Sequence, residues 1–297
     1  MRYVPHEYQE YAKEFIISHK VSALFLDCGL GKTVITLTAI WELLFDYFDI
    51  RKILIIGPLR VSRDTWPAEL EKWDHLSGVG MSVALGSEKE RLSALVRKAQ
   101  VYVINRENVE WLVNESGIPF DFDMVVIDEL SSFKSHKAKR FKALKKVRPM
   151  VRRIVGLTGT PAPNGLIDLW AEIGILDMGQ RLGRFIGGYR ERFFVPDKRS
   201  REMVFSYKPR EGAEEAIYEL ISDICISMKA VDYLDMPECV YNRVEVILSE
   251  KEMALYEQLE RDMLLPFADG DIDAVNAAAL SNKLLQMADG AVYDENG

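Results

Sequence analysis

One short stretch constrains the fold of this chain more than any other. An apolar run at 21–26 leads into Gly29-Leu30-Gly31-Lys32-Thr33, and an apolar segment from Val34 to Phe48 follows. This order predicts a strand, a glycine-rich loop and a helix. The glycines let successive backbone N–H groups turn toward an anion at the positive end of the helix dipole.

The loop has the composition of a phosphate-binding loop. Lys32 is placed to reach the β- and γ-phosphates of a nucleotide, and the Thr33 hydroxyl is placed to ligate Mg²⁺. The candidate nucleotide-binding residues are therefore Cys28, Gly29, Leu30, Gly31, Lys32 and Thr33. The match to G-x-x-x-x-G-K-[ST] is incomplete, because Leu26 stands where the pattern begins with glycine. A glycine-rich turn with a surface lysine is the alternative interpretation.

Apolar runs and helical patterns alternate along the first half of the chain. Strands are expected at 21–26, 52–57, 81–85, 101–104, 122–127 and 153–157, with a helical segment after each of the first five. The alternation predicts an α/β fold, a doubly wound parallel sheet flanked by helices. Ligands of such sheets bind at the carboxyl ends of the strands, where the motifs of this chain lie.

Two further motifs follow predicted strands. Asp128-Glu129 ends an apolar strand, where Asp128 is suited to hold Mg²⁺ and Glu129 to orient and deprotonate an attacking water. Thr158-Gly159-Thr160 ends the next strand, where hydroxyls can relay between a γ-phosphate and a neighbouring lobe. Helix-capping residues at surface turns are the simpler interpretation of both.

A helix expected over 5–20 precedes the loop, and its Gln9 carries an amide that can both donate to and accept from an adenine edge. A plain packing helix explains the same residues.

Charge is distributed unevenly along the chain. The net charge is −8, but residues 211–297 hold 20 acidic and 5 basic residues, a net of −15. Residues 1–210 hold the other 33 basic and 26 acidic residues, a net of +7, which favours a polyanion as a partner of this part. Ten Lys/Arg and no acid lie between Phe133 and Arg153, either as a solvated helix face or as phosphate contacts.

Taken together, the three motifs resemble those of superfamily 2 helicases, and within these the Swi/Snf-type DNA translocases with their phage and bacterial members. Tyr8-Gln9 resembles the adenine-reading motif, and Pro58-Leu59 with Trp66 and Glu69 resembles a segment that touches one DNA strand. Asn105-Arg106 resembles another such segment. In the second motif Leu130 and Ser131 replace the residues that usually follow Asp-Glu.

The resemblance implies a RecA-like lobe that uses ATP and Mg²⁺ and moves on duplex DNA. Its site residues would be Lys32, Asp128 and Glu129 in catalysis, Gln9 at adenine, Thr33 and Asp128 at Mg²⁺, and Thr158, Gly159 and Thr160 in coupling. DNA contacts would come from Pro58, Arg60, Asn105, Arg106 and Lys134.

The resemblance also suggests how the chain is divided. We expect a RecA-like ATP-binding lobe at 1–165, a mostly helical insertion at 166–240, and at 241–297 a returning strand and acidic helices that lead toward a second RecA-like lobe absent from this chain. Because that lobe supplies the arginine fingers, weak ATPase activity is expected from this chain alone. A non-helicase P-loop enzyme, or a nucleotide- or DNA-binding module without turnover, are the alternatives.

Other features bear on location. Three scattered cysteines, no signal-peptide core and no apolar run of 18 residues predict a cytoplasmic protein with no membrane partner. The resemblance to phage and bacterial translocases implies that the cell is a bacterial or phage-infected one.

Overall fold

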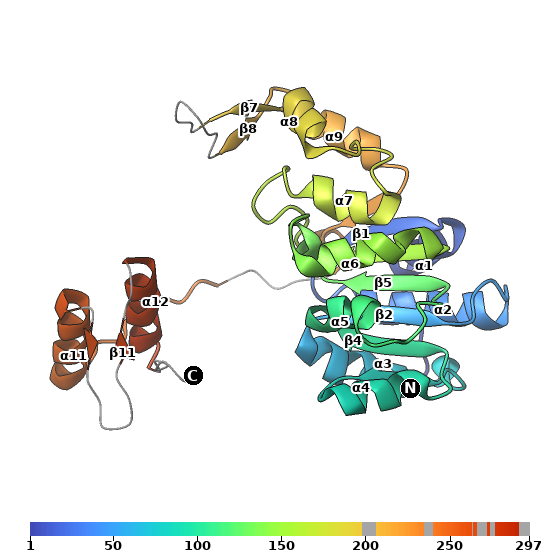
Figure 1. Cartoon of the computed structure of the whole chain (residues 1–297), viewed down its shortest axis with the longest axis horizontal. Helices are drawn as coiled ribbons and strands as arrows, with labels where there is room; N and C mark the ends of the chain where they lie inside the picture. Colours follow the sequence, from blue (N-terminus) through green and yellow to red (C-terminus); the bar gives the residue numbers. More distant parts are fainter. Residues whose placement is uncertain (198–205, 235–239, 263, 266–271, 274–276, 291–297) are drawn as a thin grey trace. The chain divides into compact units, whose positions relative to one another are not determined.

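The computed structural model describes residues 1–197, 206–234, 240–262, 264–265, 272–273 and 277–290 (Figure 1). The chain forms two compact units, residues 1–236 and 237–297. The first unit contains the sheet and the candidate motifs.

A seven-stranded parallel sheet in the order β3-β4-β2-β5-β6-β1-β9 forms the centre of the first unit. Its strands are β1 (Val21–Leu26), β2 (Ile53–Gly57), β3 (Met81–Ala84), β4 (Val101–Asn105), β5 (Met124–Asp128), β6 (Arg153–Thr158) and β9 (Cys225–Met228). Central strands such as β2 are buried along their whole length, as their continuous apolar sequences predict. The predicted α/β class with a doubly wound parallel sheet is confirmed.

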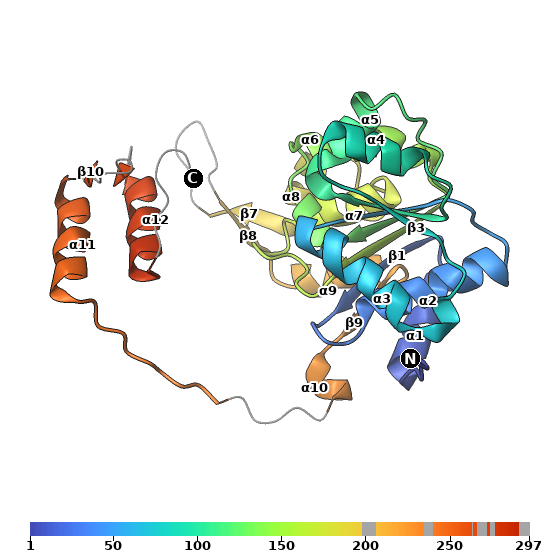
Figure 2. The same cartoon turned by 90° about the horizontal axis from the view of Figure 1, so that it is seen from below.

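Helices cover both faces of this sheet (Figure 2). One face carries α1 (Glu7–Ser18), α2 (Lys32–Phe45), the π-helical turn η1 (Val61–Thr65), α3 (Trp66–Lys72) and η2 (Asp74–Leu76). The other carries α4 (Glu88–Val96), η3 (Arg106–Asn108), α5 (Val109–Asn114), η4 (Leu130–Phe133), α6 (Lys139–Val147), η5 (Arg148–Met150) and α7 (Leu169–Asp177). Two cores result, because alternate residues of each strand point to opposite faces: Ala23 and Phe25 join one, Leu24 and Leu26 the other.

The segment after α7 is only partly the helical insertion that we expected. It holds α8 (Ile186–Phe193), the antiparallel pair β7 (Phe194–Pro196) and β8 (Tyr207–Pro209), α9 (Ala213–Ile221), β9 and α10 (Ala230–Tyr233). β9 pairs with β1, so the range 166–240 also completes the main sheet. Aromatic residues of α8 pack inside, since Tyr189 and Phe193 are buried.

The second unit consists of α11 (Glu250–Asp262), the short strands β10 (Leu264–Leu265) and β11 (Ile272–Asp273), and α12 (Ala277–Ala288). The strand expected over 241–248 is not formed, since residues 240–249 have no regular secondary structure. Val244, Val246 and Ile247 are more than three quarters exposed. A strand needs a hydrogen-bonded neighbour, and this segment has none among the residues that the structure describes.

Within the described residues, no helix is long and apolar enough to cross a membrane.

Candidate nucleotide-binding site

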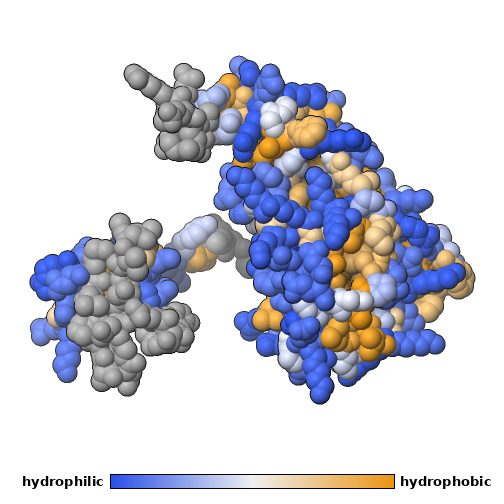
Figure 3. All heavy atoms as spheres, in the orientation of Figure 1, coloured by the Kyte–Doolittle hydropathy of each residue, from blue (hydrophilic) through white to orange (hydrophobic). Residues whose placement is uncertain are grey.

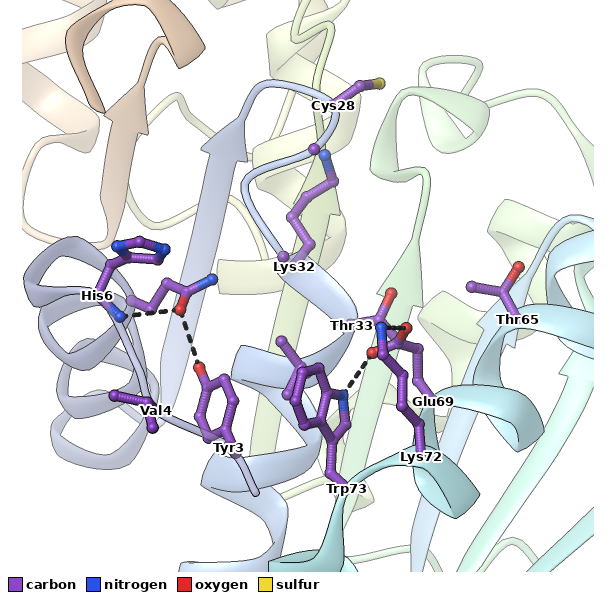
Figure 4. A pocket seen from close by; sticks show the side chains of 14 residues that line it. Tyr3, Val4, His6, Cys28, Lys32, Thr33, Thr65, Glu69, Lys72 and Trp73 are labelled. Atoms are coloured by element: carbon purple, nitrogen blue, oxygen red, sulfur yellow. Dashed lines mark hydrogen bonds and ion pairs between the residues drawn. The ribbon is translucent and has the colours of Figure 1, made fainter. Parts of the chain in front are cut away.

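The glycine-rich loop connects β1 to α2 in a conformation that its glycines make accessible. Gly29 and Gly31 have φ values of +90° and +82°, in the left-handed region, and Gly31 is the residue that precedes α2. Lys32 Nζ donates to the carbonyl oxygens of Leu26 at 2.6 Å and Asp27 at 3.2 Å. Figure 4 shows Lys32 turned toward the loop that bears Cys28. The Lys32 ammonium group donates to loop carbonyls here, and it can exchange these acceptors for the phosphate oxygens of a ligand.

Gln9 of α1 lies directly against this loop. Its Nε2 donates to the Leu30 carbonyl at 3.3 Å, and its Oε1 accepts from the His6 N–H at 3.0 Å and from the Tyr3 hydroxyl at 3.3 Å. A Cβ atom at Gly31 would come within 2.6 Å of Gln9 Nε2. The absence of a side chain at Gly31 therefore makes room for the Gln9 amide.

This close approach predicts different effects for alanine at the two loop glycines. Both substitutions force a left-handed alanine, which costs about 1–3 kcal/mol. Gly31→Ala also displaces Gln9 and weakens its hydrogen bonds, each worth about 1 kcal/mol. Gly29 has nothing within 4 Å of such a Cβ, so Gly29→Ala is the matched control. Chemical denaturation should show the larger loss of unfolding free energy for Gly31→Ala; equal losses would contradict the packing role.

The carboxylates of Asp128 and Glu129 stand at the end of β5. Asp128 is half-buried. Desolvation raises its pKa, while a hydrogen bond from Trp66 and the charge of Lys32 act in the opposite direction. Trp66 Nε1 donates to Asp128 Oδ2 at 2.9 Å. Glu129 has a left-handed backbone, with φ +62°. Such strain in a non-glycine residue is often stored at functional sites.

The third motif meets both of the others. Thr158 Oγ1 donates to Glu129 Oε1 at 2.8 Å and accepts from the Thr160 N–H at 3.1 Å. Ser131 also donates its hydroxyl to Glu129 Oε1. A Cβ at Gly159 would lie 3.2 Å from the Leu26 carbonyl oxygen and 3.6 Å from Lys32 Nζ. The structure thus brings the loop, the acid pair and the threonine motif together, as adjacent strands β1, β6 and β5 predict.

A pocket of about 510 Å³ opens beside the loop (Figure 4). It is lined by Tyr3, Val4, His6, Gln9, Cys28, Gly29, Gly31, Lys32, Thr33, Val34, Thr65, Glu69, Lys72 and Trp73. No sequence pattern marked Tyr3, Trp73 or Glu69 as pocket residues. The Glu69 carboxylate accepts from Trp73 Nε1 at 2.7 Å and from Lys72 Nζ at 3.0 Å. Glu69 and Trp66 were assigned to a DNA-touching segment, but Glu69 lines this pocket and Trp66 is fully buried.

The side chains near the loop fit the ligand set of Mg²⁺. Among the described residues, no group of three or more His, Cys, Asp or Glu is arranged to hold a metal ion. Mg²⁺ is usually held by one or two carboxylates together with phosphates of the substrate, so an all-protein cluster is not required. Asp128 supplies an oxygen at the end of β5 and Thr33 supplies a hydroxyl in the pocket wall.

The candidate DNA-contacting residues lie at or after the ends of β2, β4 and, for Lys134, β5; these neighbouring parallel strands end at the same edge of the sheet. Arg60 is exposed and Pro58 and Lys134 are half-buried. Asn105 is buried, and its amide donates to Glu107 at 3.0 Å, so it orders its own turn. Arg106 is half-buried and pairs with Glu107 at 2.8 Å. None of these residues lines the pocket.

The basic segment between Phe133 and Arg153 divides into two kinds of residue. Arg148 and Arg153 are buried and donate to backbone carbonyls, Arg148 to Leu176 and Val151, and Arg153 to the end of α1. The exposed lysines are Lys137, Lys139, Lys142, Lys145 and Lys146. The α6 face that Figure 3 shows is hydrophilic. These exposed lysines and the half-buried Lys134 remain available for either interpretation of the charge run, whereas the exposed Arg152 pairs with Asp123 at 3.1 Å.

A buried carboxyl in α7 gave no signal in the sequence. Glu172 has no exposed surface, and neither of its carboxylate oxygens has a hydrogen-bond partner. Burial, helped by the charges of Asp168 and Glu129 and opposed by the Ala162 amide and Lys134, raises the pKa of Glu172 to about 8. Glu172 therefore lies close to both the threonine-motif loop and the acid pair.

Comparison with known proteins identifies the family. Residues 8–290 match the model of the SNF2-related domain, and the chain belongs to this family. Protein p41 of Acyrthosiphon pisum secondary endosymbiont phage 1 is 36% identical over 300 residues, which cover 99% of this chain and 65% of that protein. The TATA-binding protein-associated factor mot1 of Schizosaccharomyces pombe is 30% identical over 71% of this chain and 11% of its own length.

The fold comparison agrees with the sequence comparison. The Sulfolobus solfataricus SWI2/SNF2 ATPase core, solved in complex with dsDNA, superposes with a TM-score of 0.64 at 21% identity, over 97% of this chain and 59% of that one. The expected RecA-like fold and the resemblance to Swi/Snf-type proteins with phage members are confirmed. This chain spans about two thirds of p41 and a smaller part of mot1.

Proposed function

We propose that this chain is the ATP-binding lobe of a DNA-translocating ATPase, in which ATP hydrolysis drives movement on duplex DNA. One observation carries the proposal. Gly159 lies against Lys32 while its neighbour Thr158 donates to Glu129, so three motifs distant in sequence meet beside the glycine-rich loop. Membership of the SNF2-related family supports the same reading.

Each residue at the pocket has a chemical task in this proposal. Gln9 reads the adenine edge, the loop amides and Lys32 bind the phosphates, and Thr33 and Asp128 would hold Mg²⁺. The bound ion would neutralise charge on the phosphates. Glu129 orients the attacking water and accepts its proton, and Thr158 fixes the Glu129 carboxylate for that step. Thr158, Gly159 and Thr160 pass the state of the nucleotide to the DNA-contacting loops.

DNA contact is proposed for Pro58, Arg60, Asn105, Arg106 and Lys134. The support is their position after adjacent strands and the dsDNA bound to the Sulfolobus protein. A second RecA-like lobe would complete the site with an arginine that stabilises the transferring phosphoryl group.

The proposal is tested by the rate of phosphate release with and without duplex DNA, from this chain and from the whole gene product that contains it. Duplex DNA should stimulate the whole product severalfold. The chain alone should turn over slowly, because an arginine finger is worth roughly 10³–10⁵ in rate. Equal rates with and without DNA in the whole product would favour a P-loop enzyme that does not act on DNA. Fast DNA-stimulated turnover by the 297 residues would remove the need for a second lobe.

A further inference from the structure

The strongest unassigned contact in the site is between an indole and the carboxylate of Asp128. Trp66 has no exposed surface, and its Nε1 donates to Asp128 Oδ2 at 2.9 Å across 62 residues of sequence. A buried tryptophan needs one partner for its N–H group, and the half-buried carboxylate of Asp128 needs a donor wherever water does not reach it. A backbone carbonyl could accept from the indole N–H, and a backbone N–H could donate to the carboxylate. The direct pairing of Trp66 with Asp128 therefore requires an explanation.

Local structure aims the indole at this carboxylate. Trp66 begins α3 immediately after the π-helical turn η1, and Ser62 of that turn donates to the Ile104 carbonyl oxygen at 3.3 Å. A Cβ at Gly57 would lie 3.1 Å from Ser62 Oγ and 3.4 Å from Asp128 Cβ. The ends of β2 and β5 and the η1 turn are therefore packed too closely for the indole or the carboxylate to turn freely.

We propose that Trp66 is a positioning residue that holds the Asp128 carboxylate, through its indole N–H, in the orientation that ligates Mg²⁺. This inference rests on the proposed role of Asp128. A neutral donor suits the task, because it fixes Oδ2 without cancelling the negative charge that attracts the cation. Outer partners of this kind usually change metal affinity about 10–100-fold when they are removed.

The test compares Trp66→Phe with a matched control, Trp170→Phe. Trp170 is also buried, and its Nε1 donates to the Gly183 carbonyl at 2.8 Å, so both substitutions delete one indole hydrogen bond. The measured quantity is the affinity for an imido-bridged, non-hydrolysable ATP analogue, with Mg²⁺ and with EDTA. The ratio of the two affinities isolates the contribution of the metal.

For Trp66→Phe we expect this Mg²⁺-dependent gain in affinity to fall about tenfold, with little change in EDTA. For Trp170→Phe it should stay at the wild-type value. In the Asp128→Asn background, Trp66→Phe should have no further effect on the gain, because the carboxylate it positions is gone. Equal weakening with and without Mg²⁺, or an additive effect in the Asp128→Asn background, would reduce Trp66 to a packing role and overturn the proposal.

A measurement on the wild-type protein does not depend on the folding of any variant. The indole ¹⁵N–¹H resonance of Trp66 should shift when the analogue binds with Mg²⁺ and much less when it binds in EDTA, while the resonance of Trp170 stays in place. A Trp66 resonance that responds equally in both conditions would contradict the inference. If the wild-type protein binds no analogue at all, the proposed function itself fails, and that outcome is distinct from the others.

Discussion

Replacing Glu129 with glutamine is expected to reduce ATP hydrolysis by the whole gene product about 10²–10⁴-fold, the usual contribution of a positioned general base. Glutamine keeps the size of the side chain and can still accept from Thr158, but it cannot take the proton of the attacking water. Nucleotide affinity should therefore stay near the wild-type value while the rate of phosphate release falls.

The control for this substitution is Glu115→Gln, at an exposed glutamate beyond α5. It should hydrolyse ATP at the wild-type rate. Both variants are compared by steady-state phosphate release at saturating ATP and by the affinity for the imido-bridged analogue. A Glu129→Gln rate close to that of wild type would show that another group accepts the proton and would remove Glu129 from the catalytic set.

Replacing Glu172 with glutamine is expected to stabilise the protein at alkaline pH. Folding raises the pKa of Glu172 from 4.5 to about 8. The folded state therefore binds a proton that the unfolded state has released, and stability falls as pH rises from about 4.5 to about 8. With 1.36 kcal/mol per pH unit, the wild-type protein should lose about 2 kcal/mol of unfolding free energy through this group between pH 6 and pH 8.

Glutamine has the shape of the protonated acid but does not ionise, so Glu172→Gln should remove that loss. The measurement is the midpoint of urea denaturation at pH 6, 7 and 8, with Glu211→Gln at an exposed position as the control. The control should keep the wild-type slope of stability against pH. A Glu172→Gln variant whose stability falls with pH as steeply as that of wild type would contradict burial of this carboxyl in its protonated form.

The parallel sheet could be predicted because each buried strand is marked by an apolar pattern within its own residues. Strands such as β2 bury both faces, so their continuous apolar sequences are visible without knowledge of their neighbours. The meeting of the loop, the acid pair and the threonines followed from one rule, since parallel strands place their carboxyl ends at one edge.

Features that depend on distant partners were not predictable in this way. Residues 241–248 were expected to form the returning strand, but in the described part of the chain no neighbour pairs with them. Arg148 looked like part of a solvated basic face, yet it is buried on the Leu176 and Val151 carbonyls. The contact from Trp66 to Asp128 depends on how β2, β5 and η1 pack, and the sequence spacing of the two residues does not predict it.

The position of β9 has a consequence for the order in which the protein is made. Asp27, next to the phosphate loop, donates its N–H to Met228 at 3.2 Å and accepts from the Ala230 N–H at 2.9 Å. A ribosome must therefore synthesise some 200 further residues after Asp27 before these bonds can close. In a nascent chain that stalls before β9, β1 is an edge strand with unpaired N–H and C=O groups, which can pair with other chains.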